Sequence, residues 1–344
     1  MKRKKVGVAL SGGVDSTACA LLLQKEYEVS GFFMRLAQPD FDEQHEHVRK
    51  LADCLGVSLT VVDLRQPFHN QVLDYFAKSY FAGHTPNPCL VCNREIKFGL
   101  FVEAIIDAGM DWVATGHYAR VIERSGRVRL YKGKDPSKDQ SYFLARLTRQ
   151  RLRRVIFPLG AQTKEETYSY VEKNGFHHFR GGESQDVCFL KDMKVGDYLE
   201  SMHPERAEEG DIVTEDGRKV GRHNGLFRYT VGQRRGLGIS DTTPWYVTGL
   251  DSRHNRVIVG KDQDLFRDMV AVQGVHWISG DAPNVSRNYQ VKLRSSHRGA
   301  SARLEKKGDD RWFIHFEEPQ RAISPGQFAV VYLDDEVLGA GEIV

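Results

Sequence analysis

One short stretch near the start of the chain limits the fold more than any other. VGVAL (6–10) is an apolar run of strand type, SGGVDS (11–16) contains two adjacent glycines, and residues 14–26 have the apolar spacing of a helix. A strand that turns through glycine directly into a helix is the usual opening unit of an α/β fold. The chain is therefore expected to begin with a parallel sheet.

The same alternation continues through the first third of the chain. Strand-type runs cover 28–36, 57–64 and 111–117, and helical patterns cover 43–55, 67–80 and 94–109. This order predicts a doubly wound α/β parallel sheet with helices on both faces. Ligands of such sheets bind at the carboxyl ends of the strands, which is where SGGVDS lies.

The glycine loop has the composition of a phosphate site. Its glycines allow close backbone approach, and the helix after it offers N–H groups and a positive dipole end to an anion. It is not GxxxxGK[ST], since no lysine follows, nor GxGxxG, since its glycines are adjacent. Ser11, Ser16 and Thr17 add hydroxyl donors, and Asp15 fits beside phosphate if Mg²⁺ bridges them. The alternative is an ordinary capped turn between strand and helix.

The second third of the chain mixes hairpin and helix signals. Residues 120–133 predict a hairpin that turns at Ser125-Gly126, and residues 140–154 predict a helix. Thr163 and Glu166 form a capping box for a helix that ends near Gly175.

Beyond about residue 203, helical periodicity gives way to short β-type runs. The runs are DIVTEDGRKVG, LFRYTVGQRRGLGI, WYVTGLD and RVIVG, followed from Met269 onward by VAVQGVHWI, YQVKLR, RWFIHF, FAVVYL and VLGAGEIV. We expect an α/β domain at 1–203, a small β-rich central domain at 204–266 and a C-terminal β-barrel domain at 267–344.

Composition narrows the setting in which the protein works. The 344 residues carry a net charge of +3, too small to steer the whole molecule toward nucleic acid. Arginine is concentrated locally instead, and each cluster is either a solvated face or a contact to RNA: Arg149, Arg151, Arg153 and Arg154, then Arg222, Arg228, Arg234 and Arg235. No apolar run is long enough to cross a membrane, and the run after the basic start is too short for a signal peptide. A cytoplasmic protein is expected.

A pair of cysteines lies where a helix is predicted to begin. Cys89 and Cys92 form a CxxC, and the helix end together with Arg94 and Lys97 is expected to lower a thiol pKa there. A zinc ribbon would need a second CxxC, which the sequence lacks. Cys188, in a glycine-flanked loop, is a third reactive candidate.

These motifs resemble a known superfamily and, within it, one family. SGGVDS after a strand resembles the PP-loop of the N-type ATP pyrophosphatases, which cleave ATP between its α- and β-phosphates. Five later motifs resemble, in order, those of the tRNA-specific 2-thiouridylases: TPNPCLVCNREIKFG (85–99), ATGHYAR (114–120), KDQSYFL (138–144), SQDVCFL (184–190) and YTVGQRRGLGI (229–239). The resemblance extends to SPGQ at 324–327. It implies an ATP-dependent sulfurtransferase that makes 2-thiouridine at the wobble position of tRNA.

The resemblance also implies roles for individual residues. Cys92 would be the nucleophile and Cys188 the carrier of a persulfide, and the two would form a transient disulfide. The residues implied to bind ATP are Ala9, Leu10, Ser11, Gly12, Gly13, Val14, Asp15, Ser16, Met34 and Gly116. Those implied to contact the target base are Asn87, Pro88 and Cys89, and those implied to contact tRNA are His117, Lys138, Asp139, Gln140, Arg294, Ser295 and Gln327.

Two positions depart from the family pattern. Cys89 stands where an acidic residue is common, which puts a general-base role there in doubt. Ser295 stands where an aromatic residue often follows the position of Arg294, which weakens that contact. The implied cofactors are ATP and Mg²⁺, and the implied partners of this monomer are tRNA and a sulfur-donating carrier protein or desulfurase.

The implied chemistry suits these residue types. Adenylating O2 of uridine turns an unreactive carbonyl oxygen into a leaving group, which a soft persulfide at Cys188 can displace. Cys92 then attacks the Cys188 sulfur, which leaves sulfur on the base and a disulfide to be reduced. The target base has to be flipped out of its stack first.

Three alternatives stay open. An amide-forming PP-loop ligase would need no cysteines, and a non-catalytic RNA-binding module would need neither SGGVDS nor CxxC. Within the thiolation function itself, Cys89, Cys92 and Cys188 could instead ligate a [4Fe–4S] cluster with one open iron.

Overall fold

Parallel strands form the centre of the N-terminal part of the molecule. The computed structural model describes residues 3–177, 187–190, 193–308 and 310–344. The strand order is β3-β2-β1-β4-β7, with each neighbouring pair parallel. The bounds are β1 (Lys5–Ala9), β2 (Glu28–Arg35), β3 (Leu59–Asp63), β4 (Trp112–Ala114) and β7 (Val155–Ile156). The chain winds to one side of β1 and then crosses to the other, so the switch point of the sheet is at the end of β1.

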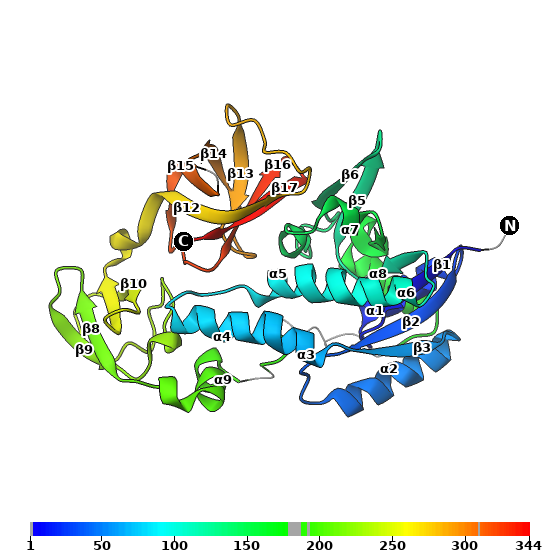
Figure 1. The fold of residues 1–344 in the computed structure, drawn as a ribbon, viewed down its shortest axis with the longest axis horizontal. Coiled ribbons are helices and arrows are strands. Elements are labelled where there is room, and N and C mark those ends of the chain that lie inside the picture. The colour runs from blue at the N-terminus through cyan, green and yellow to red at the C-terminus, as the bar shows by residue number, and fades with distance from the viewer. Residues whose placement is uncertain (1–2, 178–186, 191–192, 309) are drawn as a thin grey trace.

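Helices cover this sheet close to where the sequence predicts them (Figure 1). α1 (Val14–Leu23) follows the glycine loop, and α2 (Phe41–Leu55) ends at Gly56, whose φ of 67° is left-handed. Two longer helical segments each contain a π-helical stretch. The first is α3 (Arg65–Phe68), η1 (His69–Leu73) and α4 (Asp74–Phe81), and the second is α5 (Pro88–Cys92), η2 (Asn93–Leu100) and α6 (Phe101–Asp107).

The prediction of one helix over 140–154 is wrong. The segment holds two short pieces, η3 (Ser141–Leu144) and α7 (Arg149–Leu152). Between them Leu147 is buried, and its carbonyl accepts from His276 Nε2 of a later domain at 3.0 Å. The Thr148 side chain then caps α7 by accepting from the Arg151 N–H. Contacts with that later domain have overridden the local helical pattern.

The predicted capping box is confirmed in α8 (Lys164–Lys173), since the Thr163 and Glu166 side chains each accept from the other's backbone N–H. The short η4 (Pro158–Ala161) precedes this helix. α9 (Val195–Met202) and η5 (Pro204–Arg206) lead into the central domain.

The central domain is a small sheet of strand order β10-β11-β8-β9. Its strands are β8 (Gly210–Thr214), β9 (Lys219–His223), β10 (Tyr246–Asp251) and β11 (Arg256–Gly260), with the short helices η6 (Leu226–Arg228) and η7 (Asp262–Leu265). The β-type run predicted at 226–239 is wrong, because those described residues contain no strand. Gly232, Gly236 and Gly238 all have positive φ there, which breaks the extended backbone.

The C-terminal domain is an antiparallel barrel. Its strands run in the order β12-β15-β14-β13-β16-β17, and pairing of β12 with β17 closes the ring. The bounds are β12 (Phe266–Trp277), β13 (Asn288–Lys292), β14 (Ala300–Lys306), β15 (Arg311–Arg321), β16 (Phe328–Leu333) and β17 (Glu336–Ile343). The charge-rich β14 had no strand signal in the sequence. The barrel, the central sheet and the parallel sheet together confirm the predicted fold class, while the domain boundaries at 203 and 266 stay a prediction.

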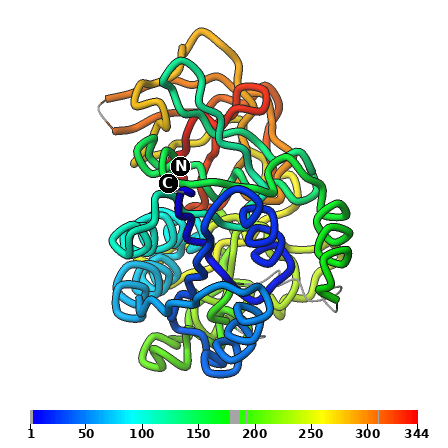
Figure 2. Tube along the Cα trace, turned by 90° about the vertical axis from the view of Figure 1, so that its right-hand side faces the viewer, coloured from blue at the N-terminus to red at the C-terminus, as the bar shows by residue number. Residues whose placement is uncertain are grey.

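A hairpin of the α/β domain extends the barrel sheet. The predicted hairpin is confirmed as β5 (Ala119–Arg124) and β6 (Arg127–Lys132), and β6 pairs with β17 through Leu130 and Val337. Figure 2 shows this hairpin rising beside the barrel. Phe328 of the barrel belongs to the same buried core as the helices of the α/β domain. The barrel is therefore fixed to the α/β domain by both a shared sheet and a shared core.

Within the part of the chain that the structure describes, no helix has the length and apolar character needed to cross a membrane.

Candidate active site

The glycine loop forms a cradle held by its own hydrogen bonds. Gly12 has a φ of 84°, which favours glycine, and Gly13 is the N-cap of α1. The hydroxyls of Ser16 and Thr17, expected to face a ligand, are buried and donate to the Gly13 carbonyl at 2.9 and 3.0 Å. Ser11 and Gly13 stay exposed. An anion can therefore meet the start of α1 through backbone N–H groups and Ser11.

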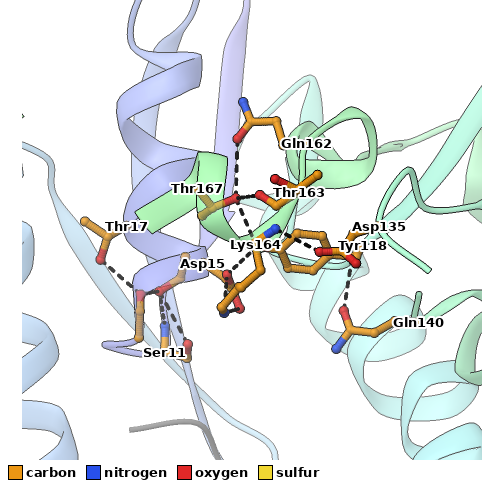
Figure 3. A network of polar contacts seen from close by, with 12 residues as sticks. Ser11, Asp15, Thr17, Tyr118, Asp135, Gln140, Gln162, Thr163, Lys164 and Thr167 are labelled. Carbon is orange, nitrogen blue, oxygen red and sulfur yellow. Dashed lines mark hydrogen bonds and ion pairs between the residues drawn. The ribbon is translucent and has the colours of Figure 1, made fainter. Parts of the chain in front are cut away.

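Asp15 is paired with a lysine that is distant in the sequence. Lys164 Nζ lies 2.8 Å from both carboxylate oxygens of Asp15, and the Tyr118 hydroxyl donates to Asp15 Oδ1 at 2.9 Å (Figure 3). The Lys164 side chain is 10% exposed and that of Asp15 is 34% exposed. Sequence patterns did not single out Lys164, although the capping box at Thr163 places it as the first residue of α8. A cation thus reaches the glycine loop from another helix, since the loop itself has none.

The carboxyl ends of β2 and β4 lie at the same edge of the parallel sheet as the glycine loop. A Cβ on Gly116, which follows β4, would lie 2.8 Å from Asp15 Cβ, so no side chain fits there. Met34 is half-buried near the end of β2. His47 of α2, which the sequence did not single out, is exposed with its Nε2 3.1 Å from the Gly12 carbonyl oxygen. Three of the expected ATP residues face inward, half-buried or buried: Ala9, Leu10 and Val14.

The CxxC lies in the first turn of α5. The Asn87 side chain caps this helix by accepting from the Leu90 N–H at 3.4 Å, and Pro88 occupies its first position. Cys89 and Cys92 are half-buried, while Cys188 is exposed. All the cysteines, each within the described residues, are free thiols. Residues 184–186 of the SQDVCFL motif lie outside the described residues.

The expectation of a lowered thiol pKa at the helix start is wrong. Burial raises the pKa of Cys89 to about 11 and that of Cys92 to about 12. Although Cys188 is exposed as a residue, its sulfur is partly withdrawn from water, which raises the pKa of this thiol as well. A Cys188 thiolate would further raise the pKa of the other two. Lys97 opposes these shifts at all three sulfurs, but its charge is the smaller effect. The three thiols therefore lie within electrostatic reach of one another and of one lysine, and are protonated at neutral pH.

A cavity of about 480 Å³ opens beside the CxxC loop where the domains meet. It brings together the expected base contacts with the expected barrel contacts, and its lining includes Asn87, Pro88, Cys89, Arg294, Ser295 and Gln327. The central domain contributes residues 230–232, and Val187, next to Cys188, completes the wall. Residues far apart in the sequence therefore share one concave site.

The remaining expected tRNA contacts lie in internal hydrogen bonds. The Asp139 carboxylate accepts from the Gly133 and Ser141 N–H groups, both at 3.1 Å, and Gln140 Oε1 accepts from the Tyr118 N–H at 3.0 Å. Lys138 shares their loop, where its N–H donates to the Asp135 carbonyl. His117 Nδ1 lies 2.8 Å from Thr115 Oγ1, and burial lowers the pKa of this imidazole. These four residues are held by contacts within the protein and are not among the residues that line the cavity.

Metal-ion ligands are not grouped in the described residues, where no three His, Cys, Asp or Glu side chains are placed to hold an ion. Cys89, Cys92 and Cys188 all lie within the described residues and do not form such a group, so their arrangement does not fit a [4Fe–4S] cluster. Asp15 could offer Mg²⁺ a carboxylate, but both of its oxygens already accept from Lys164. A magnesium ion here would take most of its ligands from a bound triphosphate.

A glycine loop at the switch point of a parallel sheet, with a helix N-terminus behind it, defines a nucleotide-binding α/β protein of the PP-loop type. Family models match each part of the chain: the tRNA methyl transferase HUP domain at 4–192, the tRNA methyl transferase PRC-barrel domain at 196–261 and the aminomethyltransferase beta-barrel domain at 267–343. The chain belongs to the tRNA-specific 2-thiouridylase family. ATP binding follows from its PP-loop domain.

Curated relatives match from end to end. A protein of Desulfotalea psychrophila is 50% identical over 344 residues, which cover 100% of both chains. Relatives from Syntrophotalea carbinolica and Syntrophomonas wolfei are 44% and 43% identical, and the alignments cover 99% and 98% of this chain and 99% of each relative. All three are named tRNA-specific 2-thiouridylase MnmA.

Proposed function

We propose that this protein is an ATP-dependent tRNA uridine 2-sulfurtransferase. It adenylates O2 of the wobble uridine and replaces that oxygen with sulfur from a cysteine persulfide, giving 2-thiouridine, AMP and pyrophosphate. The observation that carries this proposal is the cavity in which the CxxC loop, the central domain and the barrel meet. Full-length identity to relatives named as 2-thiouridylases supports it.

ATP would bind at the switch point of the parallel sheet. The exposed backbone of Ser11 and Gly13 and the start of α1 are suited to its β- and γ-phosphates. Lys164 supplies a cation near the same loop, and Met34 and Gly116 border the place for adenosine. Mg²⁺ would screen the phosphates and help the pyrophosphate leave. Attack of the uridine O2 on the α-phosphorus then yields the adenylated base.

Sulfur transfer would follow at the cysteine loop. The terminal sulfur of a Cys188 persulfide attacks C2, and AMP leaves with the former O2. The Cys92 thiolate attacks the Cys188 sulfur, breaks the S–S bond to the base, and forms a Cys92–Cys188 disulfide. A thiol reductant restores the two cysteines, and a carrier protein or desulfurase reloads Cys188. Burial keeps Cys92 protonated in the free enzyme, so its proton has to leave after tRNA and nucleotide have bound.

The tRNA would lie across all three domains of a monomer working in the cytoplasm. The wobble base, flipped from the anticodon loop, is small enough for a cavity of about 480 Å³. Asn87, Pro88 and Cys89 would meet the base, and Arg294, Ser295 and Gln327 would meet the tRNA from the barrel side. His117 and the loop 138–140 would shape the path of the bound tRNA.

The test uses the full chain with ATP, Mg²⁺, unmodified tRNA and a persulfide donor. Mass spectrometry of digested tRNA should show 2-thiouridine, formed with one pyrophosphate per modified base. Cys92→Ser and Cys188→Ser should each abolish it, whereas Cys54→Ser, on the exposed face of α2, should not. Retained activity in Cys188→Ser would favour an amide-forming ligase instead. Tight tRNA binding without any pyrophosphate release would favour an RNA-binding module.

A further inference from the structure

The barrel holds the loop that leads into the CxxC helix. The Gln327 side-chain amide donates to the Thr85 carbonyl at 2.8 Å and to the Pro86 carbonyl at 3.4 Å. In the reverse direction, the Thr85 N–H donates to the Pro325 carbonyl at 2.7 Å. Figure 1 shows this loop returning from the end of α4 to the start of α5 below the barrel. Backbone groups of a loop that lacks its own secondary structure are thus satisfied by another domain.

Close packing leaves this loop little room to move. A Cβ on Gly326, whose φ is 87°, would lie 3.0 Å from His84 Cβ and 3.1 Å from the Thr85 nitrogen. On the side of the central domain, the Thr85 hydroxyl lies 3.3 Å from the Thr230 hydroxyl oxygen. The loop is therefore held from two domains at once.

The turn that carries Gln327 is itself fixed. The Gly326 N–H donates to the Ile343 carbonyl at 2.9 Å, and the Ile343 N–H donates to the Gln327 carbonyl at 2.8 Å. The next residue, Phe328, is fully buried, and its carbonyl accepts from the Tyr142 hydroxyl of the α/β domain at 2.9 Å. The backbone of the turn is thus fixed by hydrogen bonds, and the Gln327 side-chain amide reaches from this turn to the loop.

We propose that Gln327 is a positioning residue for sulfur transfer, which reaches the reacting groups through the loop it holds. Thr85 and Pro86 directly precede Asn87, the N-cap of α5, and Cys89 and Cys92 follow in that short helix. Holding the two carbonyls sets where α5 begins, and so where both sulfurs lie relative to the cavity. This inference rests on the proposed function, and it differs from the expectation that Gln327 acts only by contacting tRNA.

The test is Gln327→Glu. The glutamate keeps the side-chain shape, but its carboxylate only accepts hydrogen bonds and cannot donate to the Thr85 and Pro86 carbonyls. In the free enzyme, amide hydrogen exchange across 84–92 should become at least about tenfold faster, since the loop loses its anchor. With saturating tRNA, the single-turnover rate of thiouridine formation should fall at least about tenfold, and further tRNA should not restore it. Gln327→Met, uncharged and also without a donor, should show the same pattern in case the carboxylate disturbs folding.

Gln273→Glu is the matched control, because Gln273 is an exposed residue of β12 in the same barrel and is not among the residues that line the cavity. It should leave tRNA binding, the exchange of 84–92 and the saturated rate near those of the wild type. The proposal is overturned if Gln327→Glu and Gln327→Met exchange like the wild type and lose only tRNA affinity. Exchange is measured without substrate, so absence of thiouridine formation by the wild type would refute the proposed function and leave the exchange test of the loop intact.

Discussion

The ion pair between Asp15 and Lys164 offers a quantitative test of how the glycine loop is built. Lys164→Met keeps much of the side-chain length but removes the ammonium that lies 2.8 Å from both Asp15 oxygens. Hydrogen bonds to charged groups contribute about 1.5–3 kcal/mol each, and the 34% exposure of Asp15 places this pair toward the lower end through solvent screening. We expect the free energy of unfolding to fall by about 2 kcal/mol.

Asp15→Asn should cost a similar amount, because it removes the carboxylate charge that the Lys164 ammonium, 10% exposed, contacts at 2.8 Å. The double variant should cost only about 2.5 kcal/mol instead of the roughly 4 kcal/mol expected for independent sites, a coupling of about 1.5 kcal/mol. Urea denaturation followed by circular dichroism measures all four proteins. Both single variants should also lose tRNA-dependent pyrophosphate release, since the cation beside the loop or its anchor is gone.

Lys134 and Glu166 provide a matched comparison near the same helix. Their contact is also 2.8 Å, but the side chains are 49% and 51% exposed, so Lys134→Met should cost less than about 1 kcal/mol. If the costs of Asp15→Asn and Lys164→Met add within about 0.5 kcal/mol, the pair does not organise the loop and our reasoning about it is refuted.

Three further predictions concern the cysteines and the RNA surface. Because the pKa of Cys92 is raised to about 12, its alkylation by iodoacetamide should be very slow at pH 7 and should accelerate roughly tenfold per pH unit up to about pH 11. Peptide mass spectrometry measures this rate, and a rate that levels off near pH 8 would contradict the conclusion that burial raises the pKa of Cys92. Cys89→Asp should retain most thiouridine formation and contain no iron by metal analysis, whereas activity that tracks iron content would support a cluster. Reversing the charge of the exposed Arg234 and Arg235 to Glu should weaken tRNA binding and reduce the slope of its salt dependence by about 2, and an unchanged salt titration would mean that both side chains are only solvated.

Local sequence signals predicted the elements of the α/β domain well. Gly56 ends α2, Ser125-Gly126 turns the β5–β6 hairpin, and Thr163 begins α8, because each of these signals acts within a few residues. Two predictions were wrong for different reasons. Residues 140–154 break into two short pieces where they contact the barrel, which the sequence could not show, whereas the positive φ of glycines within 226–239 interrupts the expected strand locally.

The family resemblance assigned Asn87 and Cys89 to the target base and Gln327 to tRNA, and the structure brings all three to one cavity. Their roles stay predictions, and the electrostatics of the site could not be read from the sequence. The sequence could not show that a residue 149 positions from Asp15 neutralises it, nor that burial outweighs the helix end and Lys97 at Cys92. Both depend on how three-dimensional packing excludes water, which has no local signature in the chain.

The strand pairing between β6 and β17 has a consequence for how the chain folds during synthesis. Leu130 and Tyr142 of the α/β domain pack in a core that also contains Phe328 and Val337. The ribosome releases the first two residues nearly 200 positions before the others, so their apolar surface stays uncovered until the last strand has emerged. A chain cut before the barrel would keep that surface exposed to water and to other chains, and co-translational completion of the α/β domain has to wait for β16 and β17.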